Sequence, residues 1–72
     1  MEYNEDLKIG IVVMAAKDYR KALRYLKRNP NNRAAQEMAR ECEGFFHSEF
    51  YETLTKVDGS YLIRKLREEA GF

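Results

Sequence analysis

The residue types that could carry covalent or metal chemistry are few in this chain. Cys42 and His47 are the only thiol and the only imidazole, and they lie five positions apart. Residues five apart on a helix point in different directions, whereas a nucleophile and its base must lie within hydrogen-bond reach of one another. One cysteine and one histidine also fall short of four zinc ligands. We therefore expect neither a Cys/His catalytic pair nor a zinc site within one chain; a metal bridging two subunits stays open.

The carboxylates form no catalytic or metal-binding pattern either. Glu37, Glu41 and Glu43 lack the accompanying histidines of a di-metal helical bundle. The sequence contains no glycine-rich phosphate loop and no serine flanked by glycines as in a nucleophile elbow. Because no acid, base, nucleophile or metal ligand stands in a recognisable constellation, we predict a protein that is not an enzyme and holds no cofactor.

Charge is distributed unevenly along the chain. The totals nearly balance, at 13 Lys and Arg against 12 Asp and Glu, but residues 17–33 are strongly basic and residues 34–60 are acidic. Clustered bases on one helix face bind phosphate backbones. The candidate contacts are Lys17, Arg20, Lys21, Arg24, Lys27 and Arg28. With a pI of about 7.8, below the usual range of nucleic-acid binders, the favoured alternative is a face that is solvated or pairs with residues 34–60 of the same or a neighbouring chain.

The elements that position these residues are predicted to be helices. One Pro and four Gly leave few helix breakers, and residues with high helix propensity dominate. We expect one all-α domain over residues 1–72, a small helical bundle of three main helices with a short fourth. The first helix should begin after an N-cap at Asn4 and run to about Arg28. Apolar residues alternate over 7–13 as in a strand, yet the absence of a turn before residue 17 favours helix.

The remaining helices follow from turn and capping residues. Pro30 should end the first helix, and either it or the following asparagines should start the second. Ser48 should cap a short helix through Leu54, unless residues 33–54 form one continuous helix, and Asp58 should cap the last helix to about residue 70. The predicted core stripe of the second helix is Ala35, Met38, Cys42, Phe45 and Phe46. Phe50 and Tyr51 extend this aromatic cluster, which we expect to supply the core and, in part, an interface.

Residues 7–16 are apolar nearly all round. A helix of this kind is buried on more than one side, and 72 residues hardly supply two covering layers. One cysteine also excludes an intrachain disulfide, so a partner chain is the remaining way to stabilise so small a core. We therefore expect a homo-oligomer, most simply a two-fold dimer. The predicted self-association residues are Ile9, Val12, Val13 and Ala16.

The sequence also bears on compartment. The start of the chain is acidic, unlike a secretion signal, and the longest apolar run, residues 9–16, is too short to span a membrane. A single cysteine suits a reducing environment. We expect a cytoplasmic protein with no membrane partner.

A helix-turn-helix interpretation of residues 49–69 is the alternative source of DNA contacts. It would direct Tyr61, Arg64, Lys65 and Arg67 toward a groove. The acids of the same segment would then lie close to phosphates, which opposes this interpretation.

Residues 45–66 carry a resemblance. The stretch Phe45-Phe46-His47-Ser48-Glu49-Phe50, followed by Val57-Asp58-Gly59 and by residues 61–66, is similar to small uncharacterised proteins of prophages and mobile elements of Gram-positive bacteria. The resemblance covers the C-terminal half and implies no activity. It implies an accessory protein that binds another macromolecule, which agrees with the predicted function, a small helical interaction module with nucleic-acid binding as the alternative.

Overall fold

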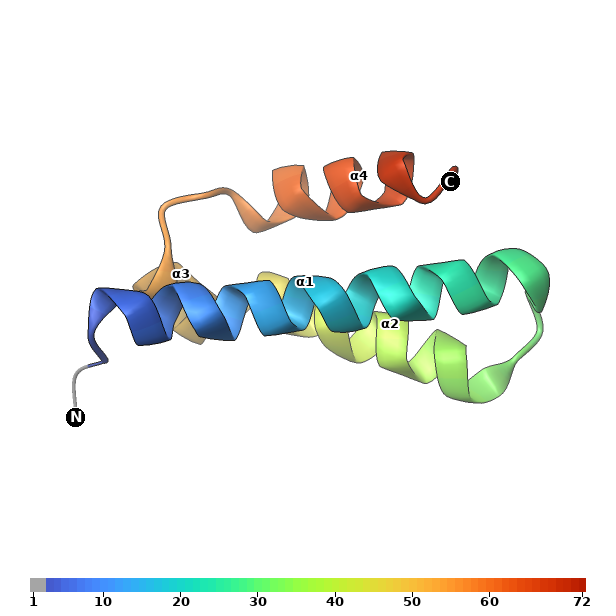
Figure 1. Ribbon diagram of the computed structural model, residues 1–72, viewed down its shortest axis with the longest axis horizontal. Helices are drawn as coiled ribbons and strands as arrows, with labels where there is room; N and C mark the ends of the chain where they lie inside the picture. The colour runs from blue at the N-terminus through green and yellow to red at the C-terminus, as the bar shows by residue number, and fades with distance from the viewer. Residues whose placement is uncertain (1–2) are drawn as a thin grey trace.

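The computed structural model describes residues 3–72, and its regular elements are four helices (Figure 1). They are α1 (Glu5–Arg28), α2 (Arg33–Phe46), α3 (Glu49–Leu54) and α4 (Gly59–Glu69). No strand occurs among these residues, so the predicted all-α bundle of three main helices and one short helix is confirmed. The alternating apolar residues near the start lie in the helix α1, and not in a strand. No helix between residues 3 and 72 is both long and apolar enough to cross a bilayer.

Each helix begins at a polar side chain that accepts a hydrogen bond from a backbone amide of the first turn. Such caps satisfy amides that have no partner within the helix. Asn4 and Asp58 cap α1 and α4, as predicted. Of the two asparagines that follow Pro30, Asn32 caps α2. Ser48 accepts from the Tyr51 amide at 3.1 Å, and its hydroxyl donates to the Phe45 carbonyl at 2.6 Å. Helices α2 and α3 are therefore separate.

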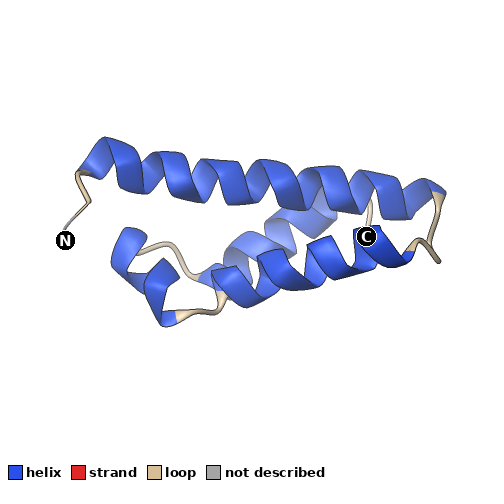
Figure 2. Ribbon diagram, turned by 90° about the horizontal axis from the view of Figure 1, so that it is seen from below, coloured by secondary structure: helices blue, strands red, loops and turns tan. Residues whose placement is uncertain are grey.

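The helices are arranged around α1, which runs along the molecule. In the view of Figure 1, α2 lies below α1 and runs antiparallel to it, and α4 lies above α1. Seen along the perpendicular direction, α2, α3 and α4 all lie on one side of α1 (Figure 2). The outer side of α1 is therefore left without cover by another helix.

The core lies between α1, α2, α3 and the end of α4. Its most buried large side chains are Tyr19, Leu23, Phe46 and Tyr51. The Phe46 ring packs edge-on against both tyrosines, at 5.8 Å from Tyr19 and 5.7 Å from Tyr51 between centroids, which is a favoured aromatic geometry. Aromatic side chains thus supply much of the apolar contact that holds the four helices together.

The predicted core stripe of α2 is wrong at one position. Met38 is 43% exposed, and Ala39 lies in the core instead. The buried residues of α2 are Ala35, Ala39, Cys42 and Phe46. Small residues on this stripe let α1 and α2 approach closely, which leaves no room for a methionine between them. Phe45 is half-buried and Phe50 is exposed, so the aromatic cluster divides between core and surface.

One glycine is required by a close approach. A Cβ atom added to Gly59 would clash with the backbone carbonyl of Phe46. The first turn of α4 therefore packs directly on the end of α2, and any side chain at Gly59 would force the two apart.

The helix-turn-helix interpretation lacks its structural basis here. In that motif the two helices pack on one another, whereas α3 and α4 pack mainly against α1 and α2. Two of its predicted groove contacts are also engaged within the chain. Arg67 lies 3.9 Å from the Glu43 carboxylate, and Lys65 lies 3.6 Å from that of Glu68.

Candidate interaction surfaces on α1

The groups with reactive side chains do not converge. Cys42 is buried in α2, where burial raises the pKa of its thiol and nearby acids raise it further. A raised pKa keeps the thiol protonated and weakly nucleophilic. His47 is exposed at the C-cap of α2. Among residues 3–72, no group of three or more His, Cys, Asp or Glu side chains is arranged to hold a metal ion.

A partly buried polar contact joins α1, α2 and α4. The Tyr19 hydroxyl donates to Glu43 Oε2 at 2.6 Å, and Arg67 lies 3.9 Å from the same oxygen. Burial raises the pKa of Tyr19 to about 12, and the hydrogen bond to Glu43 raises it as well. Tyr19 is fully buried, whereas the Glu43 and Arg67 side chains are 34% and 43% exposed, so this contact ties the core packing of α1 to the surface of α2 and α4.

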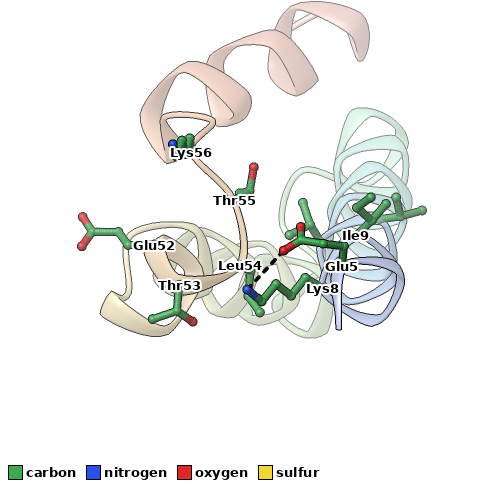
Figure 3. Close-up of a pocket in the computed structure, with 10 residues that line it drawn as sticks. Glu5, Lys8, Ile9, Glu52, Thr53, Leu54, Thr55 and Lys56 are labelled. Atoms are coloured by element: carbon green, nitrogen blue, oxygen red, sulfur yellow. Dashed lines mark ion pairs between the residues drawn. The ribbon is translucent and has the colours of Figure 1, made fainter. Parts of the chain in front are cut away.

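The first half of α1 and the α3–α4 connection enclose a groove of about 490 Å³ (Figure 3). Its polar side chains are of mixed type, with Lys8 paired to Glu5 at 3.5 Å. Its apolar rim is supplied by Ile9 and Val13 of α1. Its other charged side chains are Glu52 and Lys56, and the groove continues the apolar surface of α1.

The six predicted basic contacts fall into two groups. Arg20 donates from Nε to Glu69 at 2.6 Å, and Lys27 donates to the Gly71 carbonyl and lies 5.0 Å from the Phe72 ring centre. The last residue of α4 therefore engages one of the six side chains, and the segment after α4 engages another. The other four are exposed and make no ion pair among the described residues: Lys17, Lys21, Arg24 and Arg28.

These four residues follow one another at spacings of four, three and four. Residues so spaced lie in one line along a helix. We call Lys17, Lys21, Arg24 and Arg28 the basic stripe. None of its members pairs with the acidic residues 34–60 of the same chain, so the predicted intrachain pairing with that segment is absent from the described part of the protein.

The predicted self-association residues also divide. Ala16 is buried in the core, and Val12 is half-buried against the core and lines the groove described above. Ile9 is 58% exposed and Val13 is 43% exposed. Sequence reasoning missed two further exposed residues on this half of α1, Leu7 and Met14. The inward positions could have been found from the sequence. Residues three, four and seven positions before Tyr19 lie on the same side of the helix, and these are Ala16, Ala15 and Val12.

The exposed apolar residues of α1 surround a glycine. No atom would lie within 4 Å of a Cβ added to Gly10, so the helix surface there is open. We call Leu7, Ile9, Gly10, Val13 and Met14 the apolar face. The outer side of α1 thus carries an apolar face along its first half and the basic stripe along its second half.

A second, smaller apolar groove lies between α1 and α2. It has a volume of about 210 Å³, and Tyr25 and Met38 are its large exposed apolar side chains. It lies beside Lys21 of the basic stripe, away from the apolar face.

Comparison of the chain with models of protein families, with curated proteins and with solved structures finds no significant match in any of the three. Its function must therefore be argued from these surfaces.

Proposed function

We propose that the protein is a small helical interaction module that acts by binding macromolecules and that associates with itself. One observation carries this proposal: in the apolar face of α1, Met14 is 63% and Ile9 is 58% exposed. The other helices all lie on one side of α1 (Figure 2). Contiguous exposed apolar surface marks an interaction site or an aggregation hazard. In a chain of 72 residues, such a surface is a large part of all the apolar area available.

The size and shape of the molecule support a partner chain. Its accessible surface is 5498 Å², whereas a folded monomer of 8.5 kDa is expected to expose about 4,700 Å². Its Cα radius of gyration is 12.6 Å, against about 11 Å expected for this length. The excess of about 800 Å² is what each partner buries in an interface of standard size. A dimer formed along α1 would bury part of that excess.

Sedimentation velocity at increasing protein concentration tests the proposal. The expected result is a monomer that converts to a dimer in the micromolar range, and a monomer at several hundred micromolar would overturn self-association. Val13→Glu should weaken the dimer, because a charge would be buried in the interface. Met38→Glu is the matched control, since Met38 has the same 43% exposure but lies on α2. A dimer sensitive to Met38 and insensitive to Val13 would contradict the assignment to the apolar face.

Nucleic-acid binding is the second candidate function, favoured by the basic stripe. Four cations in one line, without acidic partners in the described structure, form a surface that releases counterions when it meets phosphates. Their contacts would be to the backbone and would carry no base specificity.

Fluorescence anisotropy with labelled duplex and single-stranded DNA, at low and moderate salt, tests this function. Affinity should fall steeply as salt increases. The double variant Lys21→Glu/Arg24→Glu should abolish binding, whereas Arg33→Glu/Arg40→Glu changes the charge equally on the exposed face of α2 and should retain it. Equal loss from both variants would mean non-specific attraction, and no binding at low salt would remove this candidate.

The biological setting is part of the same proposal. The resemblance of residues 45–66 supports an accessory protein of a prophage or mobile element. A reducing cytoplasm is supported by the single, buried and unpaired Cys42.

A further inference from the structure

The outer side of α1 carries a row of four residues that suggests how two copies meet. Asp6, Gly10, Val13 and Lys17 follow at spacings of four, three and four, and all four are exposed. They therefore form one line along the helix. The row begins with the acid Asp6 and ends with the base Lys17. Between them lie Gly10, which has no side chain, and the apolar Val13.

Two copies of this row are complementary to one another when they run in opposite directions. In a two-fold interface the same surface is used twice, so that if residue i meets residue j, then j meets i. Two antiparallel copies of α1 centred between Gly10 and Val13 would bring Asp6 against Lys17 of the partner subunit. The same register would bring Gly10 against Val13 of the partner subunit. A parallel arrangement in register would instead set acid against acid and base against base, which is repulsive.

We infer that the protein forms an antiparallel two-fold dimer through α1 in this register; the inference rests on the self-association proposed above. The end charges are free to pair, because neither Asp6 nor Lys17 has an ion-pair partner among residues 3–72. Each dimer gains two such pairs by symmetry.

The centre of the row offers a recess and a side chain to fill it. At Gly10 the surface of α1 is open for 4 Å around an added Cβ, and Val13 is exposed one helical turn away. Small residues let two helix backbones approach closely, so Val13 of the partner subunit would fill the space above Gly10. At 100° per residue, Leu7 and Met14 flank the row on one side and Ile9 on the other. These flanking side chains would close the interface around the central contact.

No helix between residues 3 and 72 obstructs this arrangement. Helices α2, α3 and α4 lie on the opposite side of α1 (Figure 2). The overlap from Asp6 to Lys17 spans about 17 Å of helix. Lys21, Arg24 and Arg28 extend past it, so most of the basic stripe would remain exposed in the dimer.

Charge reversal tests the register. Asp6→Lys and Lys17→Glu should each raise the dimer Kd roughly tenfold at low salt, because each replaces two attractive pairs by two repulsive ones. The double variant Asp6→Lys/Lys17→Glu should return the Kd to within about threefold of the wild type. An equimolar mixture of the two single variants should also associate tightly, because both pairs are again of opposite sign in the heterodimer.

The design separates the possible failures. A wild type that stays monomeric overturns the proposed self-association itself. A wild-type dimer whose Kd is unchanged by both single reversals keeps self-association and overturns the register. Single variants that are weak and not rescued, either in the double variant or in the mixture, overturn the pairing of Asp6 with Lys17. Circular dichroism of each variant identifies loss of helix, which Asp6→Lys could cause in the first turn of α1.

Discussion

The inner side of α1 presents Tyr19 and Leu23, which have no exposed surface, whereas its outer side presents Ile9 and Met14, which are more than half exposed. Both sides carry large apolar residues, but only the inner one meets α2, α3 and α4. Burial stabilises the fold in proportion to the area removed from water. The inner side of α1 therefore accounts for folding, whereas the exposed apolar residues of the outer side contribute little to the stability of the monomer.

Polar groups follow the same division. On the inner side, the Tyr19 hydroxyl is hydrogen-bonded to Glu43, which Arg67 approaches in turn. On the outer side, Asp6 and the basic stripe have no ion-pair partner among residues 3–72. Substitutions on the inner side, where the polar groups are paired, should therefore lower the stability of the fold. Substitutions on the outer side, where the charges are unpaired within residues 3–72, should instead affect binding.

The largest expected effect is on the inner side. Leu23→Ala should lower the free energy of unfolding by about 2–5 kcal/mol, because it removes buried methyl groups and leaves a cavity. Met14→Ala removes a comparable side chain from the outer side and should change the stability of the monomer by less than about 0.5 kcal/mol. Urea unfolding at a concentration where the protein is monomeric measures both. Equal losses from the two variants would contradict the division between the two sides.

A smaller effect is expected at the hydrogen bond on the inner side. Tyr19→Phe should lower stability at neutral pH by about 1–2 kcal/mol, because the bond to the Glu43 carboxylate is lost. Tyr51→Phe is the matched control, since the Tyr51 hydroxyl is buried without a hydrogen-bond partner in the structure and little is lost with it.

The pH dependence of stability checks the same bond. The pKa of Tyr19 is about 12 in the folded protein and 10.0 ordinarily, so the unfolded chain loses this proton first. The stabilisation from this group is therefore complete below pH 10 and is lost as the pH rises from 10 to 12. Urea unfolding across this range should show a shallower decline for Tyr19→Phe than for the wild type. Identical slopes would mean that Tyr19 ionises as freely in the folded state as in the unfolded one.

The helix boundaries were predictable because their causes are local. Asn4, Ser48 and Asp58 each bond to an amide three residues ahead, and the sequence contains everything that such a cap needs. The position of the basic stripe was predictable for the same reason, since a spacing of three and four residues fixes one side of a helix.

The inward face of residues 7–16 was harder to assign, because a segment that is apolar all round does not indicate its own orientation. Its orientation follows from contacts with α2 and α3, which place Ala16 inside and Ile9 outside. The engagement of Arg20 by Glu69 was beyond sequence reasoning altogether, since 49 positions separate the two residues. The helix that carries the candidate residues was thus predictable from the sequence, whereas which of their side chains remain exposed depends on tertiary packing.

The smallest expected change in stability comes from the glycine at the centre of the outer side. Gly10→Ala should raise the stability of the monomer by about 0.5–1 kcal/mol, because alanine favours the helix and a new Cβ meets nothing within 4 Å. Gly44→Ala in α2 is the matched control, since its surroundings are equally open. The two variants should therefore be stabilised alike when monomeric, as thermal unfolding at low concentration would measure.

Self-association should distinguish the two glycines. In the proposed dimer a methyl group on Gly10 occupies the space that Val13 of the partner subunit needs, so Gly10→Ala should raise the dimer Kd while Gly44→Ala leaves it unchanged. Sedimentation velocity of both variants gives the comparison. Because Gly10→Ala is expected to make each subunit more stable, weaker association could not be attributed to damaged folding. An unchanged Kd for both would mean that the outer side of α1 meets its partner away from Gly10.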